Sequence, residues 1–314
     1  MSQATTDILL LAIGVVALLT ALSFFGEVLR ARQPEGRTST VVETFVMRVH
    51  TWWAMVLLLA LALIVGFPGV LLLFAFASFA ALREFMTYTH KRRADHLSLA
   101  AAFFVVLPLQ YVFLWTGDEG LFGTFVPVYA FLLLPMLSAF RGDTRSFLVR
   151  VAETQWGLMI AVFCLSHLPA LMVLDIPGFE NRTALLIVFF VMVVQAGDLL
   201  AFYFGLRLGR TRIAPDLSPR TWEGTICGLA SAALVGAALA WITPFGVFPA
   251  MVMASVASAT GMAGSLVFTA IKRERGVSDW SHLIPGQGGF LDQLDSAIFA
   301  APIFFHLTGT IWAV

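Results

Sequence analysis

The chain alternates between long apolar runs and short polar connections. An α-helix needs about 20 apolar residues to cross the hydrocarbon core of a bilayer. By that measure the sequence contains ten runs that predict membrane-spanning helices. They cover residues 7–29, 51–66, 68–86, 97–115, 120–140, 154–174, 183–205, 224–243, 245–270 and 293–313.

The segment Gly66-Phe67-Pro68-Gly69 lies between the second and third runs. It is either a tight turn between two short helices or a kink in one long helix. With ten spans, every lysine and arginine except Arg182 falls in every second connection or at the helix ends beside it. Basic residues are retained on the cytoplasmic side of membranes. We therefore expect ten spans, with both termini outside and the charged loops in the cytoplasm.

Composition agrees with this pattern. The chain is 59% hydrophobic and only 12% charged, whereas soluble globular chains carry about 25% charged residues. We expect an all-α, multi-pass protein of the cell inner membrane or plasma membrane. The net charge of zero gives no indication of a nucleic-acid partner. Two cysteines, Cys164 and Cys227, lie in apolar runs and cannot build a metal site.

No internal repeat is visible, and the chain is expected to form one membrane unit. No cleavable-signal pattern precedes the first run, so we expect it to be a retained helix. Within the unit we distinguish a scaffold of N-terminal helices, residues 1–182, from a catalytic region, residues 183–314. Loops 206–223 and 271–292 of that region are expected in the cytoplasm.

Two carboxylates, Asp292 and Asp295, stand three residues apart where the last span begins. That spacing places both on one helix face near the membrane surface. Adjacent carboxylates repel unless a cation or proton lies between them, and Mg²⁺ is commonly held by one or two carboxylates with substrate phosphates. Alternatively, Asp292 caps the helix and Asp295 interacts favourably with its positive N-terminal end.

Asp198 lies inside an apolar run, about two turns before its cytoplasmic end. Ionisable side chains at such depth are costly and usually face a polar interior or a site. The alternative is a structural aspartate satisfied by a partner. His167 and His306 also lie inside apolar runs, where we expect hydrogen-bonded packing residues.

Two polar loops on the predicted cytoplasmic side could share a phosphorylated substrate. The loop at 286–289 is rich in glycine, which allows backbone amides to approach phosphate oxygens. Lys272 and Arg273 precede it at a helix end, where a single basic residue is by default a membrane anchor. The other loop carries Ser218-Pro219-Arg220-Thr221-Trp222-Glu223-Gly224. Because each loop lies next to an aspartate on a helix, we expect one shared site.

At these residues the chain resembles the phosphatidate cytidylyltransferase (CDP-diacylglycerol synthase) family. The family's signature runs Ser-x-x-Lys-Arg, Lys-Asp, Pro-x-His-Gly-Gly and Asp-Arg-x-Asp. The matching positions are Thr269, Lys272, Arg273, Asp279, Pro285, Gly288, Gly289, Asp292 and Asp295. A second block, a helix-borne Asp followed by Ser-Pro-basic-Thr-Trp-Glu-Gly, resembles Asp198 and residues 218–224. The resemblance is specific over residues 183–310.

The resemblance implies transfer of CMP from CTP to phosphatidic acid, giving CDP-diacylglycerol and pyrophosphate in phospholipid biosynthesis. It implies that Asp292 and Asp295 bind Mg²⁺, with Asp198 as a further ligand or as support for the ligands. Lys272 and Arg273 would neutralise phosphates. The implied substrate-binding residues are Ser218, Arg220, Thr221, Glu223, Thr269, Gly288 and Gly289. Membrane lipids are the expected surroundings, and a homodimer is left open.

Four positions depart from the family pattern. Ser278 stands where the family has Lys, Gln287 where it has His, and Gln293 where it has Arg. Ser265 stands where an acidic residue, thought to help hold metal, is usual. The loop at Arg220 is also one basic residue short. These departures indicate a divergent member of the family. They leave open whether its activity is reduced or directed to a different lipid or nucleotide.

Three other functions remain open from the sequence. A CTP-dependent kinase of polyprenol or phytol would move the γ-phosphate of CTP rather than its α-phosphate. A lipid-binding paralogue without activity would not bind CTP. A transporter is compatible with ten spans and an intramembrane aspartate, but the lack of repeats and the phosphate-type loops on one side argue against it.

Overall fold

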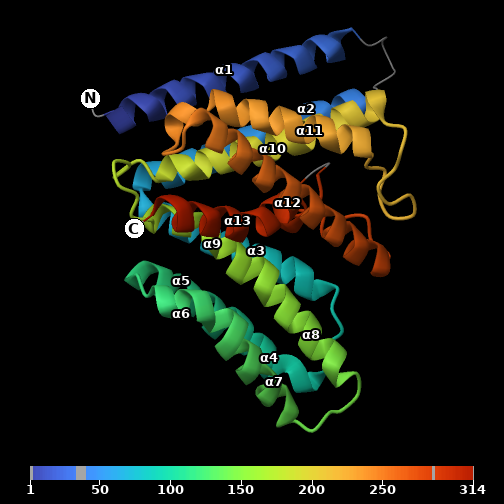
Figure 1. Ribbon diagram of the computed structural model, residues 1–314. Helices are drawn as coiled ribbons and strands as arrows, with labels where there is room; N and C mark the ends of the chain where they lie inside the picture. The colour runs from blue at the N-terminus through green and yellow to red at the C-terminus, as the bar shows by residue number, and fades with distance from the viewer. Residues whose placement is uncertain (1–2, 33–39, 285–286, 314) are drawn as a thin grey trace.

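The computed structural model describes residues 3–32, 40–284 and 287–313, which form a bundle of helices (Figure 1). The α-helices are α1 (Gln3–Ala31), α2 (Thr40–Val65), α3 (Phe67–Thr87), α4 (His96–Ala101), α5 (Leu107–Thr116), α6 (Glu119–Thr124), α7 (Phe131–Ala139), α8 (Phe147–Leu158), α9 (Leu165–Ala170), α10 (Ala184–Leu208), α11 (Trp222–Ala238), α12 (Val247–Glu274) and α13 (Phe290–Trp312). The described residues form no β-strand, only the isolated bridges Arg212–Thr221 and Ile284–Gly288. The predicted all-α membrane fold is confirmed.

Nine helical segments in the described ranges are long and apolar enough to cross a membrane. Three of them join two α-helices through a π-helical turn, at Ala102–Val106, Phe125–Ala130 and Met159–Cys164. The predicted span at 224–243 corresponds to α11, which has only 17 residues. It ends at Ala238, and a short 3-10 turn, Ala240–Ile242, leads to Pro244. The residue before a proline disfavours helical backbone, so this helix is shorter than the predicted span.

The second and third spans are separate helices, as the charge pattern predicts. Gly66 between α2 and α3 has φ +84°, a left-handed conformation that glycine adopts without steric cost. Pro68 lies in the first turn of α3, where a helix makes no use of a backbone N–H. The chain therefore reverses at Gly66, and α3 packs against α2.

Both ends of the chain lie at the same end of the bundle (Figure 1). The connection between α10 and α11 and the one between α12 and α13 lie at the opposite end. At the end that holds the termini, Arg182 forms an ion pair with Asp7 of α1 at 2.6 Å. This arrangement agrees with termini on one side and charged loops on the other. That the termini face outside stays a prediction.

Close packing of α10 against α11 positions the first polar loop. A Cβ at Gly224 would lie 2.6 Å from the Ala201 carbonyl oxygen, and one at Gly228 would lie 2.5 Å from the Ala201 Cβ. Glycine thus lets the two helix backbones approach closely, as small residues do in membrane bundles. Helix α13 packs against α12 and also against α3 and α9 of the N-terminal part. The division at residue 182 stays a prediction.

Candidate active site

Four segments that are distant in sequence converge on one polar cluster. Asp198 comes from α10, Arg220 from the loop before α11, Ser265 from α12, and Asp295 with Ser296 from α13. We call these five residues the carboxylate ring. The two aspartates, which the sequence predicts to meet, are thus brought together.

Arg220 closes one side of the ring. Its Nη1 donates to Asp198 Oδ1 at 3.0 Å, and its Nη2 donates to Ser265 Oγ at 3.1 Å. The side chains of Arg220 and Asp198 are 26% and 21% exposed, so the ion pair is only partly shielded from solvent. A planar guanidinium suits such a two-partner contact, because its N–H groups point in fixed directions.

Serine hydroxyls close the other side. Ser265 Oγ donates to Asp295 Oδ2 at 2.9 Å. The Ser296 hydroxyl donates to Asp198 Oδ2 and lies 3.2 Å from Asp295 Oδ1, and its backbone N–H donates to the same Oδ1 at 2.6 Å. One hydroxyl therefore touches both carboxylates. With one arginine for two aspartates, the ring carries a formal charge of −1 and attracts cations.

Asp292 has a different set of partners. Its Oδ1 accepts from Lys272 Nζ at 2.8 Å, and its Oδ2 accepts from the backbone N–H of Trp280 at 2.9 Å and of Gly289 at 2.8 Å. The Gly289 contact is a helix cap, which is the second of the two roles the sequence leaves open. Asp292 therefore ties α13 to α12 and to the connecting loop.

Two glycines permit this arrangement. Gly288 has φ +86°, and a Cβ there would lie 2.8 Å from Asp292 Cγ. A Cβ at Gly289 would lie 2.6 Å from Glu84 Cδ. The nearby Pro285 and Gly286, which belong to the motif and to the glycine-rich loop, lie outside the described residues.

A groove runs beside the end of α12, with a volume of about 530 Å³. It is lined by Thr269, Lys272, Arg273, Gly276, Val277 and Ser278. Within the described ranges, Arg273 forms no ion pair and is exposed. Thr269, which lies one turn after Ser265 in α12, donates its hydroxyl proton to the Ser265 carbonyl at 2.8 Å.

The loop before α11 is held by Glu223. The backbone N–H of Arg210 donates to Glu223 Oε2 at 3.1 Å, and that of Thr211 contacts both carboxylate oxygens at 3.2 Å. These amides, the Arg210 amide first, lower the pKa of Glu223 to about 2, so it stays ionised at neutral pH. Thr221 caps α11 by accepting from the Gly224 N–H at 3.2 Å. The hydroxyl of Ser218, which is buried, accepts from the Arg220 N–H at 3.3 Å.

Three of the four positions that depart from the family pattern, Ser278, Gln293 and Ser265, have side-chain partners, whereas Gln287 Nε2 is buried without one among the described residues. Ser278 Oγ donates to Asp279 Oδ2 at 2.8 Å, and Gln293 Nε2 donates to the Gln287 carbonyl at 3.0 Å. Ser265 belongs to the carboxylate ring. His167 bonds the Phe163 carbonyl at 2.8 Å and packs 5.3 Å from the His306 ring, centroid to centroid, as expected of a packing residue.

Magnesium fits the carboxylates of Asp198 and Asp295. Mg²⁺ prefers oxygen ligands and is usually bound by one or two carboxylates, with phosphates and water completing its shell. Here both carboxylates meet at the Ser296 hydroxyl. Asp292 binds Lys272 and two backbone N–H groups and forms no hydrogen bond with the carboxylate ring; that it also binds Mg²⁺ stays a prediction. The described part of the chain holds no group of three or more His, Cys, Asp or Glu placed for one ion.

Sequence reasoning missed Ser296, Glu84 and Glu153. Ser296 follows Asp295 directly, so only the three-dimensional contact with Asp198 reveals its role. Glu84 lies in α3 and is 2% exposed, and a lone carboxylate inside an apolar run could have indicated a site. Glu153 of α8 forms an ion pair with Arg275 at the end of α12. Both glutamates reach residues 275–291 from the N-terminal part.

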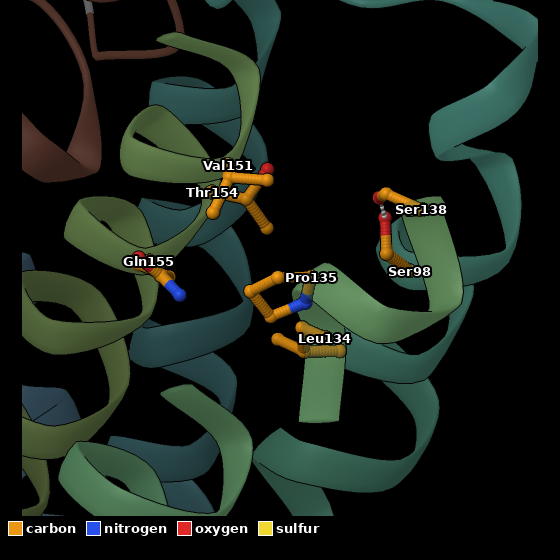
Figure 2. Close-up of a pocket in the computed structure, with 7 residues that line it drawn as sticks. All are labelled: Ser98, Leu134, Pro135, Ser138, Val151, Thr154 and Gln155. Carbon is orange, nitrogen blue, oxygen red and sulfur yellow. Dashed lines mark hydrogen bonds between the residues drawn. The ribbon is translucent and has the colours of Figure 1, made fainter. Parts of the chain in front are cut away.

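A second cavity, shown in Figure 2, lies among α4, α7 and α8. Its lining residues are Ser98, Leu134, Pro135, Ser138, Val151, Thr154 and Gln155. Its volume of about 10 Å³ is no larger than one water molecule requires. None of the predicted site residues lines it, so the carboxylate ring and the groove beside α12 remain the candidate site.

The chain is similar to known proteins over much of its length. The model of the cytidylyltransferase family matches residues 46–311. YnbB of Escherichia coli K12, an uncharacterized protein, is 31% identical over 294 residues, which cover 92% of this chain and 94% of that protein. The phosphatidate cytidylyltransferase of Synechocystis sp. PCC 6803 is 36% identical over 36% of this chain and 39% of its own length. That of Rickettsia bellii is 32% identical over 40% and 58%, so these two matches span less than two thirds of the named enzymes.

Proposed function

This chain belongs to the cytidylyltransferase family, and on that premise we propose that it transfers CMP from CTP to phosphatidic acid. The family makes it a nucleotidyltransferase of phospholipid biosynthesis. The products would be CDP-diacylglycerol and pyrophosphate. The observation that carries the proposal is the carboxylate ring, which joins Asp198, Asp295 and Arg220 from separate segments.

The reaction needs charge neutralisation and alignment more than a strong base. An oxygen of the lipid phosphate attacks the α-phosphorus of CTP, and the bond from that phosphorus to the bridging oxygen of pyrophosphate breaks. A phosphate oxygen is already a nucleophile at neutral pH, so the main barrier is repulsion between two anions. Preorganised cations and N–H groups lower such a barrier.

The chain supplies cations on both sides of the ring. Lys272 and Arg273 border the groove beside α12 and would neutralise the triphosphate and the leaving pyrophosphate. Arg220 would orient the reacting phosphate from the other side. Asp198 and Asp295 would hold Mg²⁺, which when bound supplies further positive charge to the phosphates.

The remaining predicted residues would shape the nucleotide site. Glu223 and Thr221 fix the loop that carries Arg220, and Ser218 lies behind it. Thr269 faces the groove. Gly288 and Gly289 would offer close backbone approach. The acyl chains of the lipid would remain in the bilayer, and we propose that the enzyme lies in the inner or plasma membrane. A homodimer and the absence of a nucleic-acid partner stay predictions.

The test is purified protein in lipid nanodiscs with CTP, Mg²⁺ and phosphatidic acid, followed by pyrophosphate release and CDP-diacylglycerol formation. We expect Asp198→Asn and Asp295→Asn each to lower turnover by about 100-fold, the scale of losing one preorganised electrostatic group. Asp216→Asn is the matched control, because Asp216 is exposed in the loop before α11. Turnover of either ring variant near the wild-type rate would reject the proposed site.

A further inference from the structure

Glu84 of α3 joins the two ends of the loop that precedes α13. Its Oε1 accepts from the Ser281 hydroxyl at 2.7 Å and from the Phe290 N–H at 3.1 Å. Its Oε2 accepts from the Leu291 N–H at 2.8 Å. Ser281 and Phe290 lie on either side of the glycine-containing loop, so one carboxylate fixes both ends of it.

The contact also completes the first turn of α13. The first N–H groups of a helix have no partner within the helix, and a negative charge is favourable at that end. Helix α13 begins at Phe290, and Glu84 satisfies the N–H groups of its first two residues. Because Asp292 and Asp295 lie within the first two turns of α13, the place where α13 begins determines where both carboxylates lie.

Packing around Glu84 leaves little freedom. Glu84 is 2% exposed, and a side chain at Gly289 would collide with its carboxylate. Its chain neighbour Phe85 packs on buried Trp280, with ring centroids 5.6 Å apart. Phe76, two helical turns earlier in α3, packs on Phe290 at 5.8 Å. The loop and the start of α13 are therefore held against α3.

The charge of Glu84 makes this contact a strong constraint. Within the described ranges, no lysine, arginine or histidine forms an ion pair with it. Its negative charge is balanced by the N–H groups of α13 and the Ser281 hydroxyl. Moving α13 by an ångström would leave a buried charge without partners, which is costly.

We propose that Glu84 is a positioning residue for the carboxylates of α13, so that the N-terminal part sets the geometry of the active site. This inference rests on the proposed function. Glu84 does not touch the carboxylate ring, and it acts through the backbone of Phe290 and Leu291. In a Glu84→Gln variant, the side-chain N–H₂ group would face the backbone N–H of either Phe290 or Leu291. Two donors would then point at each other, and the start of α13 would lose one of its hydrogen bonds to α3.

The test measures amide hydrogen exchange and kinetics on full-length protein in nanodiscs. We expect Glu84→Gln to speed exchange in peptides covering residues 288–295 by about tenfold or more. We expect kcat to fall by about 100-fold, as small misplacements of reacting groups do. The KM for CTP should change much less than kcat, because Lys272 and Arg273, which would neutralise the phosphates, belong to α12, and only the Gly288 and Gly289 backbone contacts lie in the released segment. A general loss of structure would not give this split.

Asp95→Asn is the matched control. Asp95 is also buried and in the N-terminal part, but it pairs with Arg150 at 3.0 Å. It forms no hydrogen bond or ion pair with the described residues 280–284 and 287–291. It should lower thermal stability while leaving exchange in residues 288–295 and kcat as in the wild type. If Glu84→Gln does not fold, Ser281→Ala removes one of the three bonds and should raise exchange in the same peptides.

The outcomes separate the two claims. Unchanged exchange in Glu84→Gln, or in Ser281→Ala where the first does not fold, would overturn the anchoring of α13. Faster exchange with an unchanged kcat would overturn the positioning role. Wild-type protein that shows no cytidylyl transfer, while Glu84→Gln still speeds exchange, would reject the proposed function and keep the anchoring.

Discussion

Replacing Asp292 with asparagine distinguishes a tether from a metal ligand. As a tether, Asp292 joins Lys272 to the backbone N–H groups of Trp280 and Gly289. Asparagine keeps one acceptor oxygen, but its N–H₂ group must then face either the lysine ammonium or the two amides. One side of the contact is therefore lost, and Lys272 no longer has a counter-charge.

The magnitude follows from burial. The side chains of Lys272 and Asp292 are 16% and 7% exposed. Removing one partner of a buried ion pair costs about 3–5 kcal/mol, and the lower end applies because Lys272 partly reaches solvent. At roughly 2 °C per kcal/mol for a chain of this size, a loss of about 3 kcal/mol lowers the melting temperature by about 6 °C.

The assay is thermal unfolding in detergent with and without Mg²⁺, together with the Mg²⁺ dependence of turnover. A tether predicts the same drop in melting temperature under both conditions, and a half-maximal Mg²⁺ concentration within about threefold of wild type. Asp295→Asn should raise that concentration by about tenfold or more. Asp216→Asn, at an exposed position of the loop before α11, should change neither the melting temperature nor that concentration. Wild-type melting of Asp292→Asn, or a raised Mg²⁺ requirement like that of Asp295→Asn, would refute the tether.

Three further predictions concern the loops and the topology. Gly288→Ala should lower the melting temperature more than Gly276→Ala does. Both variants add a side chain at positive φ, which costs about 1–2 kcal/mol, but only the Cβ at residue 288 collides with Asp292. Glu223→Gln should have a lower melting temperature than wild type at pH 7. Because the pKa of Glu223 is about 2 in the folded protein against 4.5 ordinarily, the difference in melting temperature should shrink as the pH falls from 4.5 toward 2. A difference that does not change with pH would count against the amide contacts. A C-terminal alkaline phosphatase fusion should be active and a fluorescent-protein fusion dark, and the reverse result would invert the predicted orientation.

Helix positions could be predicted because bilayer thickness sets the length of a span. The break at Gly66 could be predicted from the charge pattern, and the positive φ of Gly66 explains it physically. The length of α11 could not, because the run continues to be apolar after Ala238 where the helix ends. The hydrophobicity of a segment predicts that it is buried in lipid or protein, whereas the residue at which a helix ends depends on local backbone geometry.

The site was predictable where the chemistry is local or unusual. Asp198 is conspicuous as a charge inside an apolar run, and the structure brings it to Asp295 through Ser296. The three-residue spacing of Asp292 and Asp295 predicts a shared helix face, but the cap on Gly289 turns Asp292 toward Lys272. Spacing alone cannot separate these roles.

The contribution of the N-terminal part could not be predicted from motifs. Glu84 and Leu291 are 207 residues apart in sequence, and no sequence motif in either segment predicts their contact. The family model matches residues 46–311, which include α3, but the motifs of the resemblance all lie within residues 183–310 and so give no indication of Glu84. Long-range contacts of this kind emerge only when α13 packs on α3.

The most direct test of cytidylyl transfer at Asp198 and Asp295 follows the label of CTP into lipid. Wild-type protein in nanodiscs with phosphatidic acid and Mg²⁺ should move label from [α-³²P]CTP to lipid and none from [γ-³²P]CTP, and Asp295→Asn should lower the rate of transfer by about 100-fold. Label arriving from the γ-phosphate would indicate a lipid kinase. Full α-label transfer by Asp295→Asn would contradict a reaction that depends on the carboxylate ring.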